Sequence, residues 1–340
     1  MKIKWLTQIE PVEADTIPWF IDNIDADQIR NVLADCAAPL AVSDHYGSIE
    51  QTNVPVLCFP AWISVLTSFF NKDKHAPDFE QTNYCANFTA NKKQLNRFLM
   101  IKLIGWFNIT SVDYTWSGAG DTVNLKDALD ETNDMPADIL DYLCAPITNI
   151  KPRFFEHPQA RHDSHRLDIA DTRHGRFSVG FWELWFRQMY TNTAVSLIAE
   201  DLRLHRAALF TEKTVWSVMA QTFPIWIGGY KQAQAWKDMG FDIFEDVIDH
   251  GYQDRPSLIE RCYAAFELNL EILANLDLAA QLRLKHRQRL INNRDRVFAG
   301  AFEQRIDHLI LQQPESYHNL LQNAVKSYFD KMKDPVLTNK

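Results

Sequence analysis

Short apolar runs alternate with segments of helical periodicity over the first part of the chain. The elements that this pattern predicts are Lys2–Leu6, Ala26–Cys36, Leu40–Ser43, Val54–Phe59 and the apolar stretch Ala61–Phe70. Runs of this kind, ending at turn residues, are typical of a parallel sheet flanked by helices. We therefore expect residues 1–78 to form a small α/β domain, with the polar segment Asn71–Asp78 as a linker at its end.

A second α/β series follows, and we assign it to a Rossmann-like domain over residues 79–255. Its expected elements are strands at Tyr84–Phe88, Val112–Trp116, Ala194–Ala199 and Phe223–Ile227, and helices at Lys92–Trp106 and Glu212–Gln221. The polar, charge-rich stretch His157–Arg176 is expected to be a surface loop or insertion.

From Pro256 onward the pattern changes to long amphipathic helices, and no strand pattern returns. Leu258, Cys262, Ala265 and Leu268 share one face at helical spacing. Residues 256–340 are therefore expected to be a helical segment that packs on the two domains. The fold class that fits is α/β, with two Rossmann-like domains facing a cleft and closed by C-terminal helices.

Composition restricts the class of protein. A chain of 340 residues that is 46% hydrophobic can bury a full core. Its longest apolar stretches fall short of the roughly 18 to 20 residues of a membrane helix, and no cleavable signal opens it, so we expect no membrane partner and a cytoplasmic location. Five cysteines without a CxxC pair indicate reduced thiols.

The net charge of −9 argues against a protein that coats nucleic acid, because phosphate contacts need a surplus of Lys and Arg on some face. The most basic run is Arg283–Arg296, whose charges recur around an expected helix. We interpret that run as a solvated helix face.

The segment Phe210–Gly228 carries the clearest chemistry. It follows an expected strand, and ligands of open parallel sheets bind beyond the carboxyl ends of strands, where helix N-termini point N–H groups at anions. Thr211 is a good N-cap, which places Glu212 and Lys213 in the first helical turn. A carboxylate there can accept hydrogen bonds from a ribose diol, and a lysine can pair with a diphosphate. The alternative is a plain helix cap with a solvated lysine.

This region resembles the donor-binding half of GT-B glycosyltransferases of the fucosyltransferase-like type, close to a set of phage and bacterial proteins assigned to that class. The matching residues are Ala199–Glu200–Asp201, Phe210–Thr211–Glu212–Lys213 and Phe223–Gly228, with further likeness over Lys231–Asp254 and Asn87–Arg97. The chain departs from the pattern at Ala199 and Asp201, where relatives have Ser and Thr, and near Gly229–Tyr230, where they have a smaller residue or Gly-Ser-Pro. It also has Asn91–Lys92–Lys93 in place of an arginine pattern.

The resemblance implies transfer of a sugar from a nucleotide diphosphate sugar to a hydroxyl acceptor, without a metal or other cofactor. Glu212 would bind the ribose and Lys213 the leaving diphosphate. The other residues that it places at the donor are Glu200, Thr211, Asn91, Lys92, Lys93, Arg97, Gly228 and Tyr230. Tyr230 would stack on a base or cap the pocket, or be a rim aromatic without a role. The one Asp-x-Asp, Asp25–Asp27, is expected to cap a helix.

An acceptor-side base would lie across the cleft. Asp44 or His45 follows the expected strand Leu40–Ser43, although Asp44 could equally form a turn before Gly47. The cluster His157, His162, Asp163 and His165 fits a solvated loop better than a zinc site.

Two alternatives stay open for the function. The protein could be a phage enzyme that glycosylates a hydroxymethylated base of DNA in the host cytoplasm, or a non-catalytic nucleotide-binding protein of the same fold.

Overall fold

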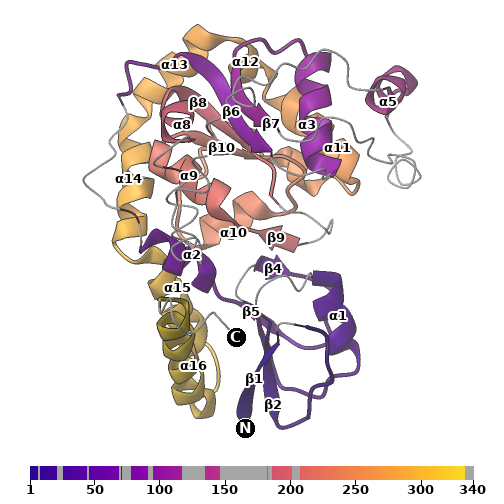
Figure 1. Cartoon of the computed structure of the whole chain (residues 1–340), viewed down its shortest axis with the longest axis vertical. Coiled ribbons are helices and arrows are strands. Elements are labelled where there is room, and N and C mark those ends of the chain that lie inside the picture. The colour runs from indigo at the N-terminus through magenta and orange to yellow at the C-terminus, as the bar shows by residue number, and fades with distance from the viewer. Residues whose placement is uncertain are drawn as a thin grey trace, which may run out of the picture.

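The structure is a computed structural model that describes residues 1–6, 8–20, 26–43, 46–68, 70, 78–90, 95–116, 135–145, 182, 186–200 and 207–333. Two four-stranded parallel sheets organise this part of the chain, one in the lower and one in the upper half of Figure 1. The expected mixed α/β class with parallel sheets is confirmed.

The first sheet has the strand order β1-β2-β3-β5. Its strands are β1 (Lys2–Leu6), β2 (Thr16–Phe20), β3 (Ala41–Ser43) and β5 (Val56–Cys58), and α1 (Ala26–Ala34) and α2 (Ala61–Thr67) complete the unit. The sequence pattern predicted β1, β3 and β5 but not β2, although β2 is buried at every position and pairs with both neighbours.

The second sheet has the order β10-β8-β6-β7. Its strands are β6 (Tyr84–Ala90), β7 (Val112–Trp116), β8 (Thr193–Ile198) and β10 (Phe223–Trp226). The chain leaves β6 through α3 (Leu95–Trp106) toward β7 on one side, whereas β8, α9 (Glu212–Ala220) and β10 lie on the other. The border between β6 and β8 is therefore the topological switch point, the place where open parallel sheets bind ligands.

Short elements complete the second unit. They are α5 (Ala137–Cys144), α8 (Arg187–Thr191), α10 (Gln232–Asp238) and a 3-10 turn at Gly251–Asp254. A separate antiparallel pair, β4 (Tyr46–Ile49) with β9 (Ala207–Leu209), joins the two halves of the chain. Because β4 lies between β3 and β5 of the first sheet and β9 leads into α9, this pair brings the two units together beside the start of α9.

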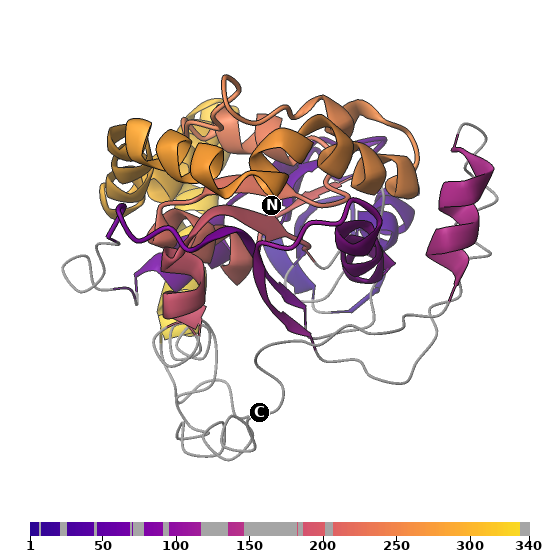
Figure 2. The ribbon, with the colours of Figure 1, turned by 90° about the horizontal axis from the view of Figure 1, so that it is seen from above.

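After Pro256 the described residues form only helices, as the pattern predicted. They are α11 (Leu258–Leu268), α12 (Leu270–Ala274), α13 (Leu276–Lys285), α14 (Arg287–Phe298), α15 (Ala301–Leu311) and α16 (Glu315–Lys333). Figure 2 shows the first of these, in orange, running along one side of the second sheet.

The last two helices return to the first sheet (Figure 1). Ile306, Ile310 and Tyr328 share a buried core with residues of β2 and β3. The ring centroids of Trp19 and Tyr328 lie 5.9 Å apart in a stacked arrangement. The C-terminal helices therefore contribute to the cores of both units.

The basic run Arg283–Arg296 differs from its prediction. It is not one helix, since α13 ends at Lys285 and α14 begins at Arg287. Arg283 is not solvated either, because its side chain is fully buried and donates hydrogen bonds to the carbonyl oxygens of Gln221 (3.3 Å) and Ala220 (3.1 Å). Arg283 thus caps the C-terminal end of α9, where free carbonyl groups favour a cation.

In the described part of the chain, no helix is both long enough and apolar enough to cross a membrane.

Candidate functional site

The start of α3 is fastened to the carboxyl ends of two strands at the switch point. The Asn96 amide donates to the carbonyl oxygens of Glu200 (3.0 Å) and Ile227 (3.4 Å), which follow β8 and β10. The neighbouring Arg97 is buried, and its Nε donates to the carbonyl oxygen of Ala199 at 3.2 Å. The Arg97 bond holds its guanidinium group next to the carboxyl end of β8. In this class of fold a nucleotide would bind at that end of the strands.

The first turn of α9 has the expected cap. Thr211 is in extended conformation, and its hydroxyl accepts a hydrogen bond from the Lys213 amide at 3.4 Å. Lys213 Nζ lies 2.9 Å from Glu212 Oε1, and the exposed fractions of the two side chains are 7% and 25%. Lys213 is therefore not a solvated charge. Of the alternative interpretation, a plain helix cap with a solvated lysine, only the helix cap agrees with the structure.

The Glu200 side chain accepts hydrogen bonds from two residues at the start of α9. Its Oε1 accepts hydrogen bonds from the Thr211 amide (3.0 Å) and the Thr214 hydroxyl (2.7 Å), and its Oε2 accepts from the Thr211 hydroxyl. Trp226 Nε1 of β10 in turn donates to the Thr214 hydroxyl at 3.1 Å. The carboxyl end of β8, the start of α9 and β10 therefore share one buried hydrogen-bond network.

The two glutamates have opposite pKa shifts. Burial raises the pKa of Glu200, and the nearby charge of Glu212 adds to this rise. Burial also acts to raise the pKa of Glu212, but its ion pair and hydrogen bond with Lys213, helped by Arg97, outweigh burial, so that its pKa is lowered. Glu212 is thus an ionised acceptor at neutral pH, suited to a pair of ribose hydroxyls.

Gly228 stands where the chain leaves β10, and a side chain would not fit there. Its φ of +74° is in the left-handed region, and a Cβ atom would lie 2.5 Å from Leu258 Cδ1. Its carbonyl oxygen accepts a hydrogen bond from the buried Arg261 at 3.1 Å. The glycine therefore lets the end of β10 approach the start of α11.

Tyr230 links the two units of the chain. Its hydroxyl donates to Glu50 Oε2 at 2.9 Å, and Lys231 Nζ lies 2.6 Å from Glu50 Oε1. Glu50 directly follows β4, and sequence reasoning missed it because it lies 180 residues from Tyr230. Whether Tyr230 also stacks on a base stays a prediction.

Several candidates lie outside the described residues. They are Asp44, His45, Asn91, Lys92, Lys93, Asp25 and the segment His157–Arg176. Tyr46, which follows His45, pairs with Leu209 just before Thr211. Among the residues that are described, no group of three or more His, Cys, Asp or Glu side chains could hold a metal ion.

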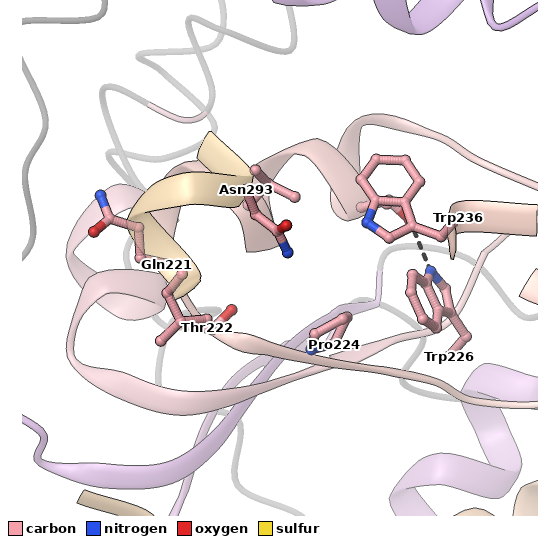
Figure 3. A pocket seen from close by; sticks show the side chains of 9 residues that line it. Gln221, Thr222, Pro224, Trp226, Trp236 and Asn293 are labelled. Atoms are coloured by element: carbon pink, nitrogen blue, oxygen red, sulfur yellow. Dashed lines mark hydrogen bonds between the residues drawn. The ribbon is translucent and has the colours of Figure 1, made fainter. Parts of the chain in front are cut away.

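A small cavity lies beside Trp226 and Trp236 (Figure 3). Thr222, Pro224, Trp226, Trp236 and Asn293 line it, together with residues of α9. Its volume is about 10 Å³, which suits at most about one water molecule. This cavity is too small for a nucleotide, so the switch point remains the candidate donor site.

Comparisons of the chain with protein-family models, with curated proteins and with solved structures found no match. The assignment of a function therefore depends on the residues and geometry of the site.

Proposed function

We propose that this protein is a glycosyltransferase that moves a sugar, as a hexosyl or pentosyl group, from a nucleotide diphosphate sugar to a hydroxyl acceptor. One observation carries the proposal. Glu212 and Lys213 form a mostly buried pair in the first turn of α9, near Arg97, at the switch point of a parallel sheet.

The three side chains divide the work on the donor. The ionised Glu212 accepts hydrogen bonds from the ribose hydroxyls, while Lys213 turns from Glu212 to the diphosphate. Arg97 and the positive end of the α9 dipole add positive potential at the same place. Charge that develops on the leaving diphosphate is then stabilised by fixed cations and dipoles, which is sufficient without a bound metal.

In this proposal the acceptor binds to the other unit of a GT-B arrangement, opposite the donor unit. The first sheet, together with α15 and α16, forms the acceptor-side unit, and the β4–β9 pair and Glu50 join it to the donor unit. Asp44 or His45 is the proposed general base, because β4 begins directly after them and pairs beside the start of α9. A cytoplasmic location is part of the same proposal.

The test is release of free nucleoside diphosphate across a panel of nucleotide sugars, with and without hydroxyl acceptors, including duplex DNA that carries a hydroxymethylated base. Lys213→Ala should lower kcat by about a hundredfold or more, because it removes a charge that acts on the leaving group. Glu212→Ala should mainly raise KM, by about tenfold or more, since it removes a contact to the ribose.

Lys237→Ala is the matched control. Lys237 lies on α10 and makes an exposed ion pair with Glu245, so its loss should leave both constants unchanged. Wild-type kinetics in both site variants would refute the site. Nucleotide-induced thermal stabilisation without turnover of any donor would favour the non-catalytic nucleotide-binding alternative.

A further inference from the structure

Glu200 directs its carboxylate at the start of α9, where Thr211 and Thr214 donate hydrogen bonds to it. Its side chain is fully buried, and both carboxylate oxygens are used. Its own carbonyl oxygen accepts from Asn96, which fixes the chain just after β8. Glu200 therefore connects the chain after β8 with the start of α3 and the first turn of α9. It is shielded from solvent.

The two threonine hydroxyls show why a carboxylate is needed. Each hydroxyl has one proton to donate, and each also accepts an N–H: Thr211 from the Lys213 amide and Thr214 from Trp226 Nε1. Their protons therefore both point at Glu200, which also receives the Thr211 amide. A carboxylate can accept from all three donors, whereas a glutamine amide in its place would present N–H donors of its own.

We propose that Glu200 is a positioning residue, which fixes the first turn of α9 and so orients Glu212 and Lys213, and that it does not bind the donor itself. This inference rests on the proposed function for the roles of Glu212 and Lys213. It replaces the expectation that Glu200 contacts the nucleotide. A donor ligand needs an accessible oxygen, whereas the oxygens of Glu200 are covered by the turn.

The first test needs no substrate. Hydrogen exchange of the Thr211 and Lys213 amides should become about tenfold faster or more in Glu200→Gln, because the glutamine presents an N–H₂ group to hydroxyls that also donate. Amides in the middle of α11 should not change. Glu271→Gln, at an exposed first-turn glutamate of α12, is the control and should leave the α9 amides as in wild type. Unchanged exchange of the Thr211 amide in Glu200→Gln would overturn the proposal.

The second test is a double-mutant cycle on kcat/KM. If Glu200 acts through the turn, Glu200→Gln should lower kcat/KM by about tenfold or more in the wild-type background and by less than about threefold in the Glu212→Ala/Lys213→Ala background. Equal losses in both backgrounds would mean that Glu200 contributes independently of Glu212 and Lys213, and would overturn the positioning role.

If Glu200→Gln does not fold, the same hydrogen-exchange measurement can be made on variants of Thr214. Thr214→Val removes one donor to Glu200 and keeps the volume, so it should speed exchange of the Thr211 amide, and Thr214→Ser should restore slow exchange. Equal exchange in the two variants would overturn the proposal. An enzyme that turns over no donor refutes the proposed function, while the exchange measurements still decide the role of Glu200.

Discussion

Gly228→Ala tests how tightly the end of β10 is packed beside the candidate site. The new Cβ would lie 2.5 Å from Leu258 Cδ1, 3.1 Å from Cys262 Sγ and 3.3 Å from Asn96 Cβ, and the backbone would keep a φ of +74°. Two of these neighbours are core residues of α11, and Asn96 fastens α3 to β8. None of the three atoms is the tip of a long flexible side chain, so relief requires a shift of packed elements.

The cost has two parts. Left-handed backbone costs an alanine about 1 to 2 kcal/mol. Overpacking of a filled site adds about 1 to 3 kcal/mol. The lower entropy of the unfolded alanine chain returns about 0.4 to 1 kcal/mol. We therefore expect the free energy of unfolding to fall by about 1 to 5 kcal/mol, with a central value of about 3 kcal/mol.

Gly300→Ala is the matched control in urea unfolding. Gly300 has a φ of +80°, but its added Cβ would meet only Glu303 Oε2, at 3.5 Å. The control carries the backbone strain without the overpacking, so its cost should be about 1 kcal/mol. Equal losses of unfolding free energy in the two variants, at equal m-values, would show that the end of β10 is not packed as described.

Two further predictions concern stability. Arg283→Met should lower the free energy of unfolding by about 2 to 4 kcal/mol in urea unfolding, because it removes the buried cap of α9. Arg287→Met, at an exposed position, should cost almost nothing, and equal costs would contradict the capping role. Burial raises the pKa of Asp113 from 3.8 to about 6, so the folded state keeps a proton that the unfolded state loses between these values. Stability should therefore fall by about 3 kcal/mol as the pH rises from about 4 to 6. Asp113→Asn should abolish that fall, and identical pH profiles of wild type and variant would refute it.

Local pattern predicted most strands of the two parallel sheets from short runs that end at turn residues. The strands β1 and β7 were predicted with their observed bounds, and Thr211 was predicted as the cap of α9. The strand β2 was missed because Pro18 argues against a strand that pairs on both sides. Leu268 was predicted to share one helical face with Leu258, Cys262 and Ala265. Those three are buried, yet Leu268, the last residue of α11, is 41% exposed.

Contacts over long sequence distances were beyond the pattern. Whether Arg283 is exposed or buried depends on where the last turn of α9 lies. Helical periodicity in the sequence gives no information about that position. The β4–β9 pair is short, and its strands come from distant parts of the chain. The type of residue at Glu212 and Lys213 indicated a nucleotide site, but the supporting role of Glu200 follows only from three hydrogen bonds in the folded chain.

The most direct test of the donor site is a crystal structure of the protein with a bound nucleoside diphosphate, UDP or GDP. We expect the diphosphate to lie at the start of α9 within hydrogen-bond distance of Lys213 Nζ, with the ribose hydroxyls on the Glu212 carboxylate. A nucleotide bound elsewhere in the molecule, with the Glu212–Lys213 pair intact and without contact to it, would refute this donor site.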